Sequence, residues 1–336
     1  MRRKFIIGID LGGTNVKVGI VTTTGKLIAS KNTQTEAAKG VFSTINKITV
    51  LIDTLLKEND IRKDAILCCG IGVPGPLNLN RTLIYRAINL QGWTNVPLKK
   101  LLEKKLRLPV VVENDANVAA YGEKWVGAGR NVQSLVLYTL GTGIGGGIIL
   151  DGELWLGSNG SAGELGHITI EPNGRLCGCG NRGCLEAYSS ATAIRKIYRE
   201  LTHKTATASP VRNFSSRKYD TNLGKKPTIE GISNGVKDIC LHAKRGDRQA
   251  TSVINTAAKY LGIAIANVVH TLHPELIILS GGIAQAGNMI IKPALAEARR
   301  RVFSHLAKDI KIVRATLGDN AGIIGAAGWA ERKLHT

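Results

Sequence analysis

The chain has 336 residues, 43% of them hydrophobic, which suits one large or two modest domains and excludes a disordered chain or a disulfide-stabilised miniprotein. Its 39 glycines follow no fixed period, which excludes a collagen-like fibre and indicates special backbone turns. No stretch reaches the roughly 18 uninterrupted apolar residues of a membrane helix, and the first strand-like run begins at Lys4. We therefore expect a cytoplasmic protein without a signal peptide or a membrane partner.

The chain is strongly basic, with 45 Lys and Arg against 25 Asp and Glu and a net charge of +20. Such a surplus favours anionic partners such as nucleotides, polyphosphate or nucleic acid, although a host with generally basic proteins gives the same balance. Aromatic residues make up only 4%, which leaves few platforms for stacking single-stranded nucleic acid. The densest basic stretch lies within 203–228, which we interpret as a surface insertion, most simply a solvated loop.

Two similar segments, 5–21 and 134–150, open the two halves of the chain. Each has a β-rich run, a glycine-rich turn after a leucine, and a second β-rich run. Glycines at such a bend allow positive φ and bring backbone N–H groups against a ligand, so both turns are candidates for wrapping phosphate oxygens. An ordinary hairpin is the alternative for either copy alone. A P-loop or Rossmann turn fits poorly, because the first turn leads into a strand and the chain has no G-x-x-x-x-G-K-[ST] motif.

Alternating helices and strands follow each of these segments. Hydrophobic spacing predicts helices over 41–59, 97–107, 118–125, 248–272 and 289–302, strands over 65–73, 109–113, 275–279 and 311–315, and a terminal helix from about Asp319. A hairpin followed by β/α units, found in both halves, predicts an α/β lobe that is built twice. Two such lobes, each with a glycine-rich turn, indicate a protein that holds a polyphosphate between them.

Polar residues follow the predicted strand over 109–113. The strand stops at the run Glu113, Asn114, Asp115, Ala116, Asn117. Side chains just past the carboxyl end of a strand in an open α/β sheet project into the crevice where ligands bind. Asp115 is therefore a candidate base that accepts a hydroxyl proton while the oxygen attacks a terminal phosphate. Simple capping of the next helix by Asn or Asp is the alternative.

Three cysteines crowd into a short stretch, Cys177, Cys179 and Cys184, ten residues after His167. Such crowding in a cytosolic chain indicates a metal site rather than disulfides. Three thiolates and one imidazole are the ligands of a closed structural zinc site, while unligated thiols or a redox pair are the alternatives. Four protein ligands leave no open position for water, so we expect zinc to fix a loop and not to take part in catalysis.

Two carboxylates flank this cluster. Glu164 lies three residues before His167, within reach of one polar ligand, and Glu186 lies two residues after Cys184. If one ring nitrogen of His167 binds metal, the other stays available to a substrate hydroxyl. We expect the fixed loop to carry Glu186 into the same pocket; a carboxylate on a surface helix is the alternative.

Together these motifs resemble the ROK family of sugar kinases and regulators, within the actin-like superfamily that duplicates a ribonuclease-H-like lobe. The resemblance spans nearly the whole chain in family order. The matching segments are 10–14, 74–76, 113–117, 140–147, 163–167, 177–186 and 280–282. The resemblance implies an α/β fold with a small lobe over 1–116, on which a helix over about 319–336 packs back. It also implies a large lobe over 117–318 that contains a zinc loop over 167–184 and the basic insertion.

The resemblance implies ATP-dependent phosphorylation of a hexose at its 6-hydroxyl, with Asp115 as catalytic base. Asp10 occupies the position that the resemblance implies would orient the Mg²⁺ that accompanies ATP, through an intervening water. The implied sugar ligands are Gly75, Asn114, Asp115, Glu164, His167 and Glu186; the zinc ligands are His167, Cys177, Cys179 and Cys184. The implied nucleotide contacts are Asp10, Gly12, Gly13, Thr14, Lys17, Gly141, Thr142, Gly143, Gly281 and Gly282.

Glucose is the expected substrate, because Asn89 to Trp93 and the strand before Asp115 look most like bacterial glucokinases. An N-acetylhexosamine such as N-acetylglucosamine or N-acetylmannosamine, or another hexose, is the alternative, since hydroxyl discrimination depends on pocket geometry. The family also suggests a homodimer or homotetramer. Inorganic polyphosphate is an alternative phosphoryl donor.

Two other classes of protein fit less well. A sugar-responsive repressor needs a DNA-binding module, and only Met1, Arg2 and Arg3 precede the first strand. A nucleic-acid zinc module needs paired C-x₂-C or a downstream His pair, whereas these cysteines lie in mid-chain between α/β elements. We therefore expect no nucleic-acid partner.

Overall fold

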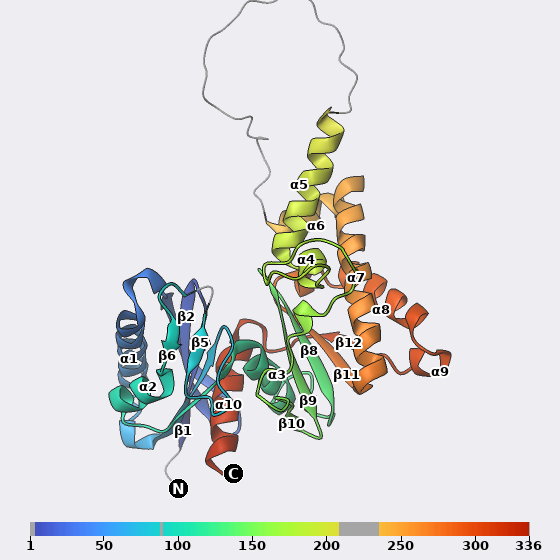
Figure 1. The fold of residues 1–336 in the computed structure, drawn as a ribbon. Coiled ribbons are helices and arrows are strands. Elements are labelled where there is room, and N and C mark those ends of the chain that lie inside the picture. The colour runs from blue at the N-terminus through green and yellow to red at the C-terminus, as the bar shows by residue number, and fades with distance from the viewer. Residues whose placement is uncertain (1–3, 88–89, 208–234, 336) are drawn as a thin grey trace, which may run out of the picture.

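Two five-stranded sheets organise the computed structural model, which describes residues 4–87, 90–207 and 235–335 (Figure 1). The first has the order β3-β2-β1-β4-β7 and the second the order β10-β9-β8-β11-β12. Each contains an antiparallel hairpin, β1/β2 or β8/β9, extended by parallel strands. The strands of the first sheet are β1 (Phe5–Leu11), β2 (Asn15–Thr22), β3 (Leu27–Gln34), β4 (Ile66–Val73) and β7 (Val110–Asn114). Those of the second are β8 (Leu135–Leu140), β9 (Ile144–Leu150), β10 (Glu153–Leu154), β11 (Leu276–Ser280) and β12 (Ile312–Arg314).

The helices cover these sheets in two groups. The first sheet carries α1 (Val41–Glu58) and α2 (Leu98–Leu106), and a small hairpin of β5 (Ile84–Arg86) and β6 (Thr94–Val96) lies nearby. The second half of the chain contains α5 (Ala191–Thr207), α6 (Val236–Lys244), α7 (Arg248–Leu272) and α8 (Asn288–Arg301), with the short α4 (Glu186–Ser189) and α9 (Ser304–Ala307). Helices α5 and α6 pack on α7. The predictions for 41–59, 97–107, 248–272 and 289–302 agree with α1, α2, α7 and α8 to within one residue at each end.

Helix α7 is long and apolar enough to cross a membrane by length and composition alone. In the structure it packs on α5, α6 and α8, and 61% of its apolar window is buried inside the protein. Ala258, Leu261 and Ile265 on this helix are almost fully buried. Its apolar character is thus accounted for by its place in the core of the second half.

Two helices cross between the sheets, α3 (Asp115–Trp125) and α10 (Ala321–Leu334) (Figure 1). Their backbones touch at a glycine, because a methyl group on Gly325 would lie 1.6 Å from the Val118 carbonyl oxygen. Helix α10 lies equally close to the first sheet, where methyl groups on Gly8 and Gly70 would fall 2.0 Å and 1.8 Å from carbonyl oxygens of α10. Backbone contact without side chains therefore fixes α10 between β1, β4 and α3.

Three expectations need correction. Helix α3 begins at Asp115 rather than at residue 118, because the Asn114 side chain caps it. The turn glycines Gly12, Gly141 and Gly143 do not have the positive φ that we expected. Close contacts account for Gly12 and Gly143, whose added methyl groups would lie 3.1 Å and 2.4 Å from oxygen atoms, whereas a methyl group on Gly141 would meet only an ordinary contact at 3.9 Å. Residues 203–207 of the proposed insertion continue α5 as a helix, and the rest of the insertion lies outside the described residues.

The crossing of α3 and α10 can be tested with Gly325→Ala. The added methyl group meets backbone, which cannot move aside as a side chain can, so we expect a loss of about 1–3 kcal/mol of stability or more. Thermal melting measures this loss. Gly178→Ala is the control, because its methyl group meets open space; equal melting of the two variants would contradict the proposed contact.

Candidate active site

A cleft of about 450 Å³ lies between the two halves of the chain. It brings together Asp115, at the start of α3, and the second glycine-rich turn, between β8 and β9. The predicted site residues that line it are Gly75, Asn114, Asp115, Gly141, Thr142, Gly143, Glu164, His167, Glu186 and Gly281. A second cleft of about 450 Å³ adjoins it at Gly281 and includes Gly282, Lys237 and Arg314.

Asp115 is the first residue of α3 and is only partly accessible in the cleft. Capping is carried out by its neighbour, since Asn114 Oδ1 accepts hydrogen bonds from Ala116 N at 2.9 Å and Asn117 N at 3.2 Å. Asp115 is therefore the first residue of the helix and not its cap, although its Oδ1 also accepts a hydrogen bond from Ala116 N at 2.8 Å. Burial raises its pKa to about 7; the charges of Asp10 and Glu164 act in the same direction, and the Ala116 N–H opposes them.

Asp10 lies at the end of β1, next to the first glycine-rich turn. It pairs across the hairpin with Lys17, whose Nζ donates a hydrogen bond to the Asp319 carbonyl oxygen at 3.1 Å. Burial raises the pKa of Asp10, Lys17 lowers it, and Asp319 raises it. Like Gly12, Gly13 and Thr14, Asp10 and Lys17 line neither cleft. The carboxylate of Asp10 is nevertheless close enough to raise the pKa of Asp115.

The second turn is braced by Glu186. Glu186 Oε2 accepts a hydrogen bond from Ile144 N at 2.8 Å, and a methyl group on Gly143 would lie 2.4 Å from the same oxygen. Only glycine leaves room for this carboxylate. The start of α5 holds the other end of this turn, because Ala191 N donates a hydrogen bond to the Gly141 carbonyl oxygen at 2.8 Å. The turn is therefore fixed by elements that follow it in the chain.

The four predicted metal ligands lie together, since the ligand atoms of His167, Cys177, Cys179 and Cys184 are all within 4.8 Å of one another. Sγ of Cys179 lies 3.7 Å from Sγ of Cys184, and Sγ of Cys177 lies 3.7 Å from Nδ1 of His167. Tetrahedral zinc, with Zn–S near 2.3 Å and Zn–N near 2.0–2.1 Å, requires ligand separations of about 3.5–3.8 Å. The donors and their spacing fit zinc, and Nε2 of His167 remains available.

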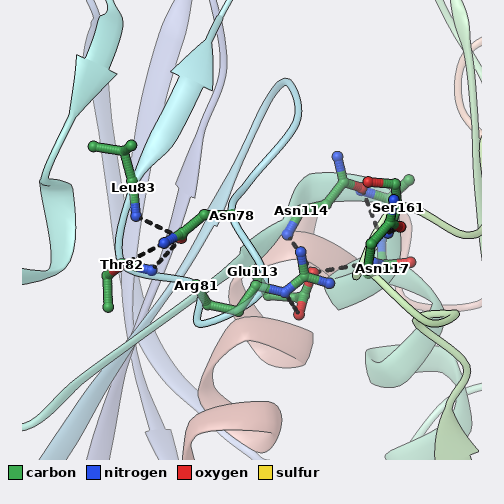
Figure 2. A network of polar contacts seen from close by, with 10 residues as sticks. Asn78, Arg81, Thr82, Leu83, Glu113, Asn114, Asn117 and Ser161 are labelled. Atoms are coloured by element: carbon green, nitrogen blue, oxygen red, sulfur yellow. Dashed lines mark hydrogen bonds and ion pairs between the residues drawn. The ribbon is translucent and has the colours of Figure 1, made fainter.

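The structure adds Arg81 to the site, which the sequence did not indicate, and shows what Glu113 and Asn117 contact. Glu113, which is 1% exposed, contacts Asn117 on α3 and Arg81 in the loop before β5 (Figure 2). Arg81 and Asn117 line the same cleft as Asp115. The sequence did contain one indication of this pairing, since Glu113 stands at the end of an apolar strand. A carboxylate that is buried there needs a cation or several hydrogen-bond donors.

A model of the ROK family matches residues 6–333. The chain belongs to the ROK family. Among its relatives, a glucokinase of Halalkalibacterium halodurans is 37% identical over 332 residues, which cover 98% of this chain and 95% of the relative. The α/β architecture with two mixed sheets is the fold of ROK sugar kinases.

Solved ROK structures share this fold. A ROK family glucokinase from Streptomyces griseus, in complex with glucose and AMPPNP, aligns with a TM-score of 0.79 and 31% identity over 98% of this chain and 99% of that chain. Regulators of the family are also similar: the xylose repressor of Caldicellulosiruptor bescii is 31% identical, and the match covers 95% of this chain and 76% of the repressor.

The raised pKa of Asp115 makes a prediction about stability. The folded protein favours the protonated form of the Asp115 carboxyl. The resulting contribution to the free energy of unfolding is fully present below the ordinary pKa of 3.8, and it is lost as the pH rises through about 7. Asp115→Asn is neutral at every pH. It is expected to melt about 3 °C or more above the parent at pH 8 and at nearly the parent temperature near pH 4.

Thermal melting of both proteins across this pH range is the measurement. Asp53→Asn on the exposed face of α1 is the matched control. A melting difference between Asp115→Asn and the parent that stays constant from pH 4 to pH 8 would show that burial does not perturb Asp115.

Proposed function

We propose that this protein is an ATP-dependent glucokinase, which transfers the γ-phosphoryl group of ATP to the 6-hydroxyl of glucose. The observation that carries the proposal is the placement of Asp115 in a cleft that also contains the second glycine-rich turn. The similar S. griseus enzyme is in complex with glucose and AMPPNP, which supports a sugar and a nucleotide as the two ligands.

Asp115 acts as the base in this proposal. Its carboxylate accepts the proton of the 6-hydroxyl as that oxygen bonds to the γ-phosphorus, and the bond from the γ-phosphorus to the bridging oxygen breaks to release ADP. A pKa raised to about 7 suits a base that is ionised near neutral pH and still binds a proton well. Since most of phosphoryl-transfer catalysis is positioning and charge stabilisation, the position of Asp115 matters as much as its basicity.

The sugar is held by polar groups on both sides of the cleft. Asn114 uses Oδ1 in the cap of α3, so its Nδ2 is the group left to donate to a hydroxyl. Glu164 and His167 line the same cleft, with Nε2 of His167 as the ring nitrogen that the cysteine cluster does not use, and Gly75 and Glu186 complete the proposed set. Hydroxyl groups that are matched by donors and acceptors in this way are the basis of selectivity among hexoses.

The nucleotide lies between the two glycine-rich turns in this proposal. Gly12, Gly13 and Thr14 contact phosphates from one sheet, and Gly141, Thr142 and Gly143 contact them from the other. Gly281 and Gly282 are assigned to the adenosine side, and Lys17 to the phosphates. Asp10 would orient the Mg²⁺ that accompanies ATP through an intervening water, and that cation would supply charge stabilisation for the phosphates.

Zinc at His167, Cys177, Cys179 and Cys184 is proposed to be structural. Residues 167–184 have little regular structure of their own, with isolated bridges in place of strands. Four protein ligands leave no position for water, so zinc fixes the loop that ends at Glu186. Zinc therefore affects the reaction only through the residues that it positions.

The remaining expectations stay predictions. The small lobe over 1–116, the large lobe over 117–318, a homodimer or homotetramer, and a cytoplasmic location belong to this group. An N-acetylhexosamine or another hexose is the alternative acceptor, and inorganic polyphosphate is the alternative donor. The similarity to xylose repressors makes a sugar-responsive repressor the second candidate function. A gel-shift titration at several salt concentrations tests it, because a repressor would bind DNA sequence-specifically.

The proposed reaction is tested by ADP release with glucose, N-acetylglucosamine, N-acetylmannosamine, mannose, fructose and allose. Glucose is expected to give the highest kcat/KM. Asp115→Asn is expected to lower kcat by about 10²–10⁴-fold while most of the sugar affinity remains, because the base is lost and the pocket is not emptied. Near-parent turnover of Asp115→Asn would refute the role of Asp115, and a different best hexose would refute glucose.

The zinc site is tested with Cys179→Ser. Metal analysis of the parent is expected to find stoichiometric zinc and that of the variant to find little. The loop would then lose its anchor, so kcat/KM for glucose is expected to fall by about 10–100-fold. Cys240→Ser, which changes a cysteine on α6 outside the cluster, is the control. A parent protein without zinc would end this proposal.

A further inference from the structure

The buried carboxylate of Glu113 holds the segment around Asp115 together. Glu113 Oε1 accepts hydrogen bonds from the Asn114 backbone N–H at 2.8 Å and from Asn117 Nδ2 at 3.0 Å. Asn114 precedes Asp115, and Asn117 lies in the first turn of α3. A buried carboxylate is costly unless it is paired and hydrogen-bonded, so its cation partner is part of the same arrangement.

That partner is Arg81, from the loop between β4 and β5. Arg81 Nε lies 3.0 Å from Glu113 Oε2, and the arginine side chain is 13% exposed. Asn78 shapes the loop, because its Oδ1 accepts from Thr82 N at 2.8 Å and Leu83 N at 2.9 Å (Figure 2). Arg81 itself has a φ of 54°, which is uncommon for a side chain of this size. The loop is therefore built to hold the guanidinium at Glu113.

The same guanidinium lies against the second half of the chain. A methyl group on Gly160 would lie 2.9 Å from Arg81 Nη1 and 3.1 Å from Cζ, so the planar group lies directly against this glycine. Gly160 belongs to the segment that leads to Glu164 and lines the same cleft. Within the part of the chain that the structure describes, Arg81 Nε and Nη2 and Glu113 Oε2 are buried and make no hydrogen bond, so Arg81 and Glu113 are joined by charge as an ion pair. Arg81 thus contacts the segment before the base on one side and the segment before Glu164 on the other.

We propose that Arg81 is a positioning residue of the kinase reaction, which sets Asp115 and the Glu164 segment relative to each other by pairing with Glu113 and lying against Gly160. This inference rests on the proposed function. The planar guanidinium makes both contacts at once, whereas a lysine ammonium would retain only the charge. A shift of about 1 Å in such an arrangement costs about 10²-fold in rate.

The test is the kinetics of Arg81→Met, which removes the charge and keeps much of the side-chain length. We expect kcat for glucose to fall by about 10²-fold and the KM for ATP to stay unchanged, because the base is displaced and the nucleotide turns are not. More ADP is expected per sugar phosphate formed, which partial unfolding alone would not cause. Arg81→Lys is expected to restore part of kcat. Arg86→Met, an exposed arginine of β5, is the matched control with parent kinetics.

Parent-like kcat and parent-like ADP release per sugar phosphate in Arg81→Met would overturn this inference and leave the proposed function intact. A parent protein that phosphorylates no hexose would overturn the proposed function and the inference with it. If Arg81→Met does not fold, Glu113→Gln decides, because it keeps an oxygen for the two hydrogen bonds and loses the charge; parent-like kcat there overturns the inference. In the double variant, a kcat no lower than that of the worse single variant supports the pair, and losses that multiply contradict it.

Discussion

The close approach of α10 to its neighbours is the constraint on which the site depends. Its backbone lies against β1 and β4 at Gly8 and Gly70, and against α3 at Gly325. At its start, a methyl group on Gly322 would lie 2.6 Å from Cγ of Asp10. One helix thus sets the distance between the carboxylate at the end of β1 and the helix that begins with Asp115. Side chains at these contacts would separate the two acids.

The two sheets then explain why each half of the chain presents a glycine-rich turn. Each sheet has its antiparallel hairpin beside the parallel strands, so each presents one glycine-rich turn at an equivalent position. The second turn is further fixed by Glu186, which follows the cysteine cluster. The cysteine loop is also tied to the core without metal, since Tyr260 OH donates to Glu171 Oε2 at 3.1 Å and Arg175 N donates to Tyr188 OH at 2.7 Å. The turn is therefore braced through a loop that is attached at several points.

Patterns that are local in the sequence predicted the structure well. The strands over 65–73, 109–113, 275–279 and 311–315 agree with β4, β7, β11 and β12 to within one residue at each end, because apolar runs and their bounding turns are read directly from neighbouring residues. The cysteine spacing likewise predicted a cluster that the structure brings together. Periodicity missed β3, whose residues alternate between partly buried and exposed positions and include no fully buried one.

Features that depend on distant partners were beyond the sequence. The backbone angles where β7 ends decide whether Asn114 or Asp115 caps α3. Because Asn114 is the cap, the helix begins at Asp115, three residues before the predicted start. Gly143 is required by Glu186 and not by a positive φ, and the two residues are far apart in the chain. The pairing of Arg81 with Glu113 likewise joins a loop to a strand that follows it only after β5, β6 and α2. Such contacts can be predicted only once the topology of the fold is known.

The most direct test of the account is a crystal structure of the protein with glucose and a non-hydrolysable ATP analogue. The quantity to measure is the distance from the Asp115 carboxylate to the sugar 6-oxygen. The account predicts a hydrogen bond of about 2.6–3.2 Å, with that oxygen directed at the γ-phosphorus. A glucose molecule bound with its 6-hydroxyl turned away from Asp115 would contradict the account.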